Sequence, residues 1–150
     1  GRLDDLEYYL ASVNLYQFLH IFRQRVLVFN LRIETLDETN SSPELPFYLK
    51  PSLGGEEALH GYQNNRFIDN SFILAAVEYR FPILRSIDGF VFFEEGRVFH
   101  EITEDFTLKN WHYSAGIGAR LWDQKGLRFS SYAAFSKEGV QFYVQLSEEL

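Results

Sequence analysis

The sequence predicts an all-β fold, and within that class a portion of an antiparallel transmembrane β-barrel with about seven strands and one long loop. Short runs of alternating apolar and polar residues recur along the chain, which is the pattern of barrel strands. Aromatic residues make up 17% of the chain, which is high for a soluble domain and typical of the aromatic girdles at two membrane interfaces. One connection, residues 36–70, is far longer than the roughly 4–6 residues that usually join elements.

Two strands are expected before this loop, at residues 7–19 and 26–35. The first alternates imperfectly, whereas the second separates its faces cleanly. Its apolar face consists of Leu27, Phe29, Leu31 and Ile33, and its polar face contains Asn30, Arg32 and Glu34. A half-buried strand of a soluble protein has the same pattern, so this strand alone does not identify a membrane barrel.

Five strands are expected after the loop, at residues 72–81, 89–99, 113–122, 127–136 and 140–147. Pro82 is expected to end the first of them, because proline has no amide hydrogen to donate to a ladder. Tight turns are expected at residues 123–126 and 137–139. Strand alternation places Ile117, Phe129 and Phe142 on the face that suits lipid.

The long loop is expected to be ordered. Between Leu53 and Asp69, Gly, Asn and Gln residues break any period of two, so no strand is predicted there. The adjacent Gly54 and Gly55 permit backbone angles that other residues resist. The segment nevertheless has a high aromatic and apolar content, which argues against disorder and leaves a functional role for its length.

This segment also carries a resemblance. The loop contains Leu53-Gly54-Gly55, Leu59-His60-Gly61-Tyr62, Arg66-Phe67 and Asp69, and the next strand ends in Glu78-Tyr79-Arg80. Together they resemble the sixth extracellular loop and following strand of the BamA/TamA superfamily, the bacterial surface antigen family of outer-membrane barrels. The hallmark of that family's loop tip is an aliphatic residue, Arg, Gly and an aromatic residue. His60 stands where the family has Arg.

Three strand patterns extend the resemblance over nearly the whole chain. Phe92, Glu94 and Gly96 match a Phe-x-Asp-x-Gly strand of the family, with Glu in place of Asp. The pattern Gly116-x-Gly118-x-Arg120 is similar to a second strand motif. The final run, Lys137-x-Gly139-x-x-Phe142-x-Val144, resembles the terminal assembly signal of outer-membrane barrels, which is read by strand pairing at an open sheet edge.

The resemblance implies that residues 1–150 are the C-terminal part of such a barrel, with a lumen-directed extracellular loop, in the outer membrane of a Gram-negative-type bacterium or a derived organelle. The implied function is insertion, assembly or translocation of proteins at that membrane. Implied partners are the lipid bilayer, client outer-membrane proteins, and further barrel strands from the same chain, a second chain or a second copy, since an open edge is not tolerated in lipid. One alternative is a barrel that anchors, or forms the exit pore of, a fused or partner domain such as a patatin-type lipase. Another is a soluble β-barrel that carries a small ligand.

Strand alternation and the resemblance together place a set of charged residues in the lumen. The set consists of His60, Glu78, Arg80, Glu94, Arg120 and Arg128. Buried charges must be paired, so a network between loop and wall is expected. In the family the loop Arg pairs with the acidic strand residue, so His60 here would face Glu94, whose extra methylene would partly compensate for the shorter side chain. His60 instead capping the loop through a backbone carbonyl remains equally open.

Composition excludes several functions. The net charge of -7 and a pI near 5.1 make a nucleic-acid partner unexpected. The chain has no cysteine, so a disulfide, a thiolate nucleophile or a cysteine metal site is not possible. It has no methionine either, so a mature product, a fragment or part of a larger chain is expected. The longest uncharged stretch, residues 8–22, is too short and too polar for a membrane-spanning helix.

No enzyme is predicted, and therefore no catalytic residue and no cofactor. Glu94 and Glu95 are adjacent in a strand and point to opposite faces, so they cannot flank one glycosidic bond. No metal site is predicted, because the acidic stretch after residue 99 has no known ligand spacing and is interpreted as a solvated loop. That stretch contains His100, Glu101, Glu104, Asp105 and His112.

Overall fold

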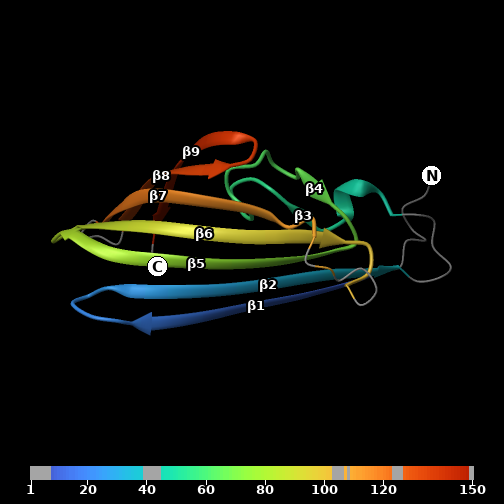
Figure 1. Cartoon of the computed structure of the whole chain (residues 1–150), viewed down its shortest axis with the longest axis horizontal. Coiled ribbons are helices and arrows are strands. Elements are labelled where there is room, and N and C mark those ends of the chain that lie inside the picture. Colours follow the sequence, from blue (N-terminus) through green and yellow to red (C-terminus); the bar gives the residue numbers. More distant parts are fainter. Residues whose placement is uncertain (1–7, 39–44, 103–106, 108, 123–126, 149–150) are drawn as a thin grey trace.

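The computed structural model describes residues 8–38, 45–102, 107, 109–122 and 127–148. These residues form one large antiparallel sheet and a small two-stranded sheet (Figure 1). The strands of the large sheet are β1 (Tyr8–His20), β2 (Val26–Glu38), β5 (Ser71–Leu84), β6 (Ile87–Phe99), β7 (His112–Trp122), β8 (Leu127–Ser136) and β9 (Gly139–Glu148). The loop between β2 and β5 contains the 3-10 turn η2 (Phe47–Leu49) and the strands β3 (Ser52–Leu53) and β4 (Phe67–Ile68).

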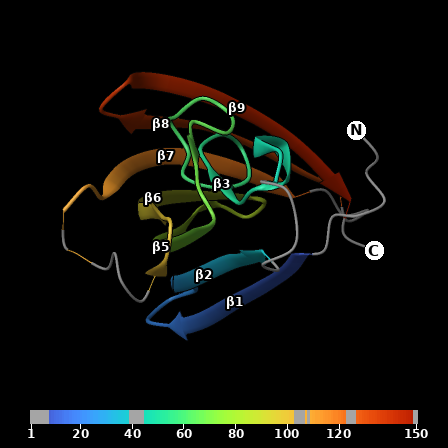
Figure 2. The same ribbon diagram turned by 90° about the vertical axis from the view of Figure 1, so that its right-hand side faces the viewer.

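The large sheet has the strand order β1-β2-β5-β6-β7-β8-β9, and every neighbouring pair is antiparallel. It is not closed, because β1 and β9 lie at its two edges. The sheet is strongly curved, and the long loop lies on its concave side (Figure 2). This arrangement confirms the predicted fold class of an antiparallel β-barrel portion with seven strands and a lumen-directed loop.

Two expectations for individual elements are wrong. β5 does not end before Pro82 but continues to Leu84, with a shift of register against β6 between these two residues. The missing proline amide falls beside a pairing irregularity, where proline is tolerated within a sheet. The long loop also contains strands after all, since β3 pairs with β4. The turn expected at residues 123–126 lies outside the described residues.

The two faces of the large sheet differ in the way that the alternation predicts. The convex face carries large apolar side chains that remain exposed, including Ile117, Phe129 and Phe142, the last with 81% of its surface accessible. The concave face carries the buried polar residues Glu94 and Ser114. An apolar outside around a polar inside is the arrangement of a barrel wall in lipid.

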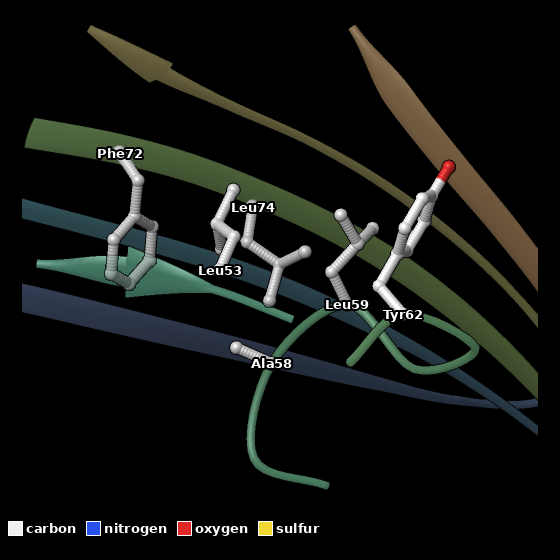
Figure 3. Packing of buried hydrophobic residues seen from close by; sticks show 6 residues of the cluster. All are labelled: Leu53, Ala58, Leu59, Tyr62, Phe72 and Leu74. Carbon is white, nitrogen blue, oxygen red and sulfur yellow. The ribbon is translucent and has the colours of Figure 1, made fainter. Parts of the chain in front are cut away.

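The long loop packs against the concave face as part of the core. Four loop residues (Leu53, Ala58, Leu59 and Tyr62) and two residues of β5 (Phe72 and Leu74) form one buried cluster (Figure 3). Leu53 and Leu59 are completely buried. Burying each leucine contributes about 1.5–3 kcal/mol, which explains why so long a connection is ordered.

Helical structure is scarce in the described part of the chain, which has the 3-10 turn η2 in the long loop. Within the described residues, no helix is long and apolar enough to cross a membrane.

Candidate functional site at the loop tip

The loop tip (Leu59, His60, Gly61 and Tyr62) turns sharply where it meets the wall of the sheet. Leu59 and Gly61 both have positive φ, +57° and +85°. A non-glycine residue in this region is uncommon, and complete burial of the Leu59 side chain holds it there. Gly61 approaches β8 so closely that an added Cβ would lie 3.2 Å from Cβ of Ser136. The backbone of the tip therefore packs directly against strand β8.

His60 binds the buried carboxylate of Glu94 on β6 through two donors. Its backbone N–H donates to Oε2 at 2.7 Å, and its ring Nδ1 lies 2.8 Å from Oε1. The Ser114 hydroxyl donates to Oε2 at 3.2 Å. The sequence left two interpretations open for His60, and the structure contains both contacts: the one with Glu94 and a weaker hydrogen bond to the loop backbone at Glu56. The two donors of one residue engage both carboxylate oxygens, which is the geometry that makes arginine-carboxylate pairs strong.

Aromatic rings surround the imidazole of His60. The centroids of Phe92, Tyr132 and Tyr143 lie 5.5, 5.4 and 5.3 Å from its centroid, each in an edge-on arrangement. Burial by itself lowers the pKa of His60, but the hydrogen bond and the negative charge of Glu94 outweigh burial and raise this pKa above its usual 6.5. The imidazolium form is thus more stable at the loop tip than in a free histidine.

The loop is also bonded to the two C-terminal strands. The Gly61 N–H donates to the Tyr143 hydroxyl of β9 at 2.9 Å, and the Ser136 hydroxyl of β8 donates to the Gly61 carbonyl at 2.6 Å. Further from the tip, Arg66 Nε donates to Glu138 Oε1 in the β8-β9 turn at 2.7 Å. Sequence reasoning missed these three partners. Alternation assigns each strand residue to a face of the sheet, but it does not say which loop atom a side chain on that face meets.

The remaining lumen charges form a second group within the wall. Arg120 donates to both oxygens of Glu78, at 2.9 and 2.8 Å, and Arg80 donates to the same carboxylate. The guanidinium of Arg120 also lies 4.0 Å from the centroid of Phe90. Glu78 and Arg80 belong to β5 and Arg120 to β7, and among the described residues this group has no hydrogen bond to the loop.

The sequence therefore predicted one network where the structure has two. The pair of His60 and Glu94 connects the loop to strand β6. Glu78 and its two arginines connect strand β5 to strand β7. Both groups line one cavity of about 260 Å³ on the concave side. Arg128 belongs to neither group, since its Nε donates to Ser147 at 3.2 Å. The separation arises because the loop tip reaches β6 but stops short of the arginines.

The strand motifs make room for the rings around His60. An added Cβ on Gly116 would lie 2.2 Å from the ring of Phe92, and one on Gly118 would lie 2.3 Å from Cβ of Tyr132. At Gly96 an added Cβ would lie 2.9 Å from Cδ1 of the loop residue Leu53. These glycines thus permit a close packing of aromatic side chains and loop against the wall.

Two residues of the proposed assembly signal, Phe142 and Val144, lie on the face opposite the loop tip, whereas the backbone of Lys137 hydrogen-bonds Tyr62. Lys137 is in the β8-β9 turn, and Gly139 begins β9 with a φ of +126°. Phe142 and Val144 are on the convex face of the edge strand β9 and are 81% and 65% exposed. An apolar row beside an unpaired backbone edge is a surface on which another strand can pair.

The described residues contain no group of three or more His, Asp or Glu side chains that could hold a metal ion. The acidic stretch after β6 is only partly covered, since Glu104 and Asp105 lie outside the described residues.

A curved sheet with an apolar convex face and a loop docked on its concave face defines a portion of a transmembrane β-barrel. Comparison with protein families identifies it further: the model of the Omp85 superfamily domain matches residues 2–146, and the chain belongs to this superfamily. The resemblance to the BamA/TamA barrels is thereby confirmed at the level of the superfamily. Omp85 proteins are barrel proteins of the outer membrane of Gram-negative bacteria and of organelles, and act in general in protein insertion or translocation. A search of curated proteins found no match.

Proposed function

We propose that this chain is the C-terminal barrel part of a BamA/TamA-type protein that inserts, assembles or translocates proteins at the outer membrane of a Gram-negative-type bacterium. The observation that carries the proposal is the docked loop tip, in which His60 holds the buried Glu94 through two donors. The chain that contains this contact belongs to the Omp85 superfamily, whose members act in general in protein insertion or translocation. The protein acts without cofactor or covalent chemistry.

The proposed mechanism separates a fixed wall from an open edge. Contacts of the loop tip with β6, β7 and β9 stabilise the curvature of the wall while the edges at β1 and β9 remain available. Strands from a client protein, or the remaining strands of the barrel, add to these edges by backbone pairing. The pattern of Lys137, Gly139, Phe142 and Val144 acts as the assembly signal at the β9 edge.

The test uses the full-length protein in liposomes with an unfolded outer-membrane barrel protein as client. The rate of client folding is followed by its heat-modifiable mobility in gels. We expect the wild-type protein to accelerate folding over empty liposomes, and His60→Ala to lose most of this acceleration. His20→Ala is the matched control, because His20 is exposed at the end of β1, away from the loop tip. Folding at the empty-liposome rate with wild-type protein would contradict the proposal and favour a barrel that anchors or serves as exit pore for another domain, such as a patatin-type lipase.

A further inference from the structure

Glu95 is a carboxylate on the lipid side of the wall. It follows Glu94 in β6 and points to the opposite, convex face. Its pairing partners are Ala75 on β5 and Tyr113 on β7. It lies two residues from Phe93, the midpoint of β6. On the convex face it follows an apolar run of β6 that ends at Phe93, so it borders the apolar band of the wall.

This carboxylate has no hydrogen-bond or ion-pair partner among the residues that the structure describes. The cation two residues further along the same face is already engaged, because Arg97 donates to the carbonyl and hydroxyl oxygens of Thr107 at 2.7 Å each. Its guanidinium also stacks on the ring of Phe99. An ionisable side chain that faces hydrocarbon without a partner is costly, and such residues mark functional contacts.

An apolar groove of about 620 Å³ lies beside Glu95. Its lining includes the apolar residues Leu15, Phe29, Leu31, Ala75 and Phe93, together with Gln17 and Glu95. The groove crosses β1, β2, β5 and β6 on their convex side, away from the cavity at the loop tip. It is a hollow large enough for several side chains of a neighbouring segment.

We propose that this groove docks a membrane-embedded segment of another protein, and that Glu95 pairs there with a Lys or Arg side chain of that segment. Charge complementarity selects this occupant, since lipid tails fill an apolar groove but give the carboxylate no donor. A second copy related by a two-fold axis through the groove would bring two Glu95 carboxylates together, which is unfavourable. Strands that complete the barrel add at the β1 and β9 edges and leave the convex face open. The inference is independent of the loop tip.

Photo-crosslinking in the full-length protein in its native membrane tests this inference. Benzoylphenylalanine replaces Phe29 in the groove or, as the matched control, Phe135 on the convex face of β8. We expect a protein adduct at position 29 and not at position 135, with the crosslinked peptide in a membrane segment that contains Lys or Arg. Glu95→Leu should reduce the yield about tenfold, and Glu95→Lys combined with Glu at the partner's basic residue should restore it.

Several outcomes would overturn the inference. They are adducts to lipid alone or to a second copy, a partner segment without a basic residue, or an equal yield in Glu95→Leu. The heat-modifiable mobility of Glu95→Leu and Glu95→Gln is measured in parallel. Both variants should keep the folded barrel, because each removes a charge from lipid. Loss of the folded barrel in both would assign Glu95 a structural role instead.

Discussion

Replacing His60 by alanine should release the long loop from the wall. The change deletes the hydrogen bond from Nδ1 to Glu94 Oε1 and the three ring contacts, but it leaves the backbone N–H bond in place. A hydrogen bond to a charged group contributes about 1.5–3 kcal/mol, and ring contacts add about 0.5–1.5 kcal/mol each when they are favourable. The free-energy contributions of neighbouring contacts do not add fully. We therefore expect His60→Ala to lose about 2–4 kcal/mol of the free energy that docks the loop.

The assay is trypsin cleavage after Arg66 in the folded protein in liposomes. Arg66 is in the loop, and its side chain is about half exposed. Cleavage of a docked loop follows the population of the open form when opening and closing are fast, so the rate should rise about 30- to 1,000-fold. His20→Ala should leave the rate unchanged, because His20 is exposed in β1 and distant in sequence from the loop. Equal cleavage of wild type and His60→Ala would refute the docking role of this side chain.

A double-variant cycle separates this contact from general loosening. If His60 acts through Glu94, adding Glu94→Ala to His60→Ala should raise cleavage by much less than Glu94→Ala does in the wild-type background. The backbone N–H of residue 60 and the Ser114 hydroxyl still bind Glu94 in the single variant, so a small residual effect is expected. Fully additive effects would show that the two residues do not interact.

Four structural features give further predictions. Because the pKa of His60 is raised in the folded protein, the contribution of this side chain to docking is complete below about pH 6.5 and is lost as the pH rises through the raised pKa. Loop cleavage should therefore increase with pH in wild type and change little in His60→Ala. Ile117→Arg should destabilise the barrel by about 2–4 kcal/mol in urea titrations in lipid, whereas Ile117→Val should have a small effect; equal midpoints would reverse the assignment of the lipid face. Gly116→Ala places a Cβ against Phe92 and should cost about 1–3 kcal/mol in the same titration. His60→Arg alone should increase loop cleavage, and adding Glu94→Asp should reverse the increase; no reversal would show that the length of the acidic side chain does not matter.

The sequence predicted the wall of this structure better than its contacts. Strand faces follow from a period of two, which depends only on neighbouring residues; Glu78 and Arg120, both expected inside, line the concave cavity. The path of the loop depends on contacts between distant residues. Gly61 is bonded to Ser136 and Tyr143, which are 75 and 82 residues further along the chain. The alternation of apolar and polar residues does not determine which loop residue lies beside which strand residue. The loop contacts of the C-terminal strands were therefore missed.

The continuation of β5 through Pro82 was also not predictable from local rules. Those rules describe a proline within a regular ladder, whereas here the register of β5 against β6 shifts just beyond it. The short β3-β4 pair escaped notice for a related reason. Each of these strands has two residues, and no alternation can be recognised over so short a length.

The histidine at the loop tip changes how the loop is held, and the backbone makes the change possible. A guanidinium carries two parallel donors on one side chain, whereas an imidazole directs one nitrogen at a carboxylate. In this chain the backbone N–H of His60 supplies the second donor, so the main chain of the tip must approach the wall. The missing Cβ of Gly61 permits this approach to Ser136. A side chain longer than histidine would have to displace the rings of Tyr132 and Tyr143, so the geometry of the tip, the glycine beside it and the length of Glu94 form one matched set.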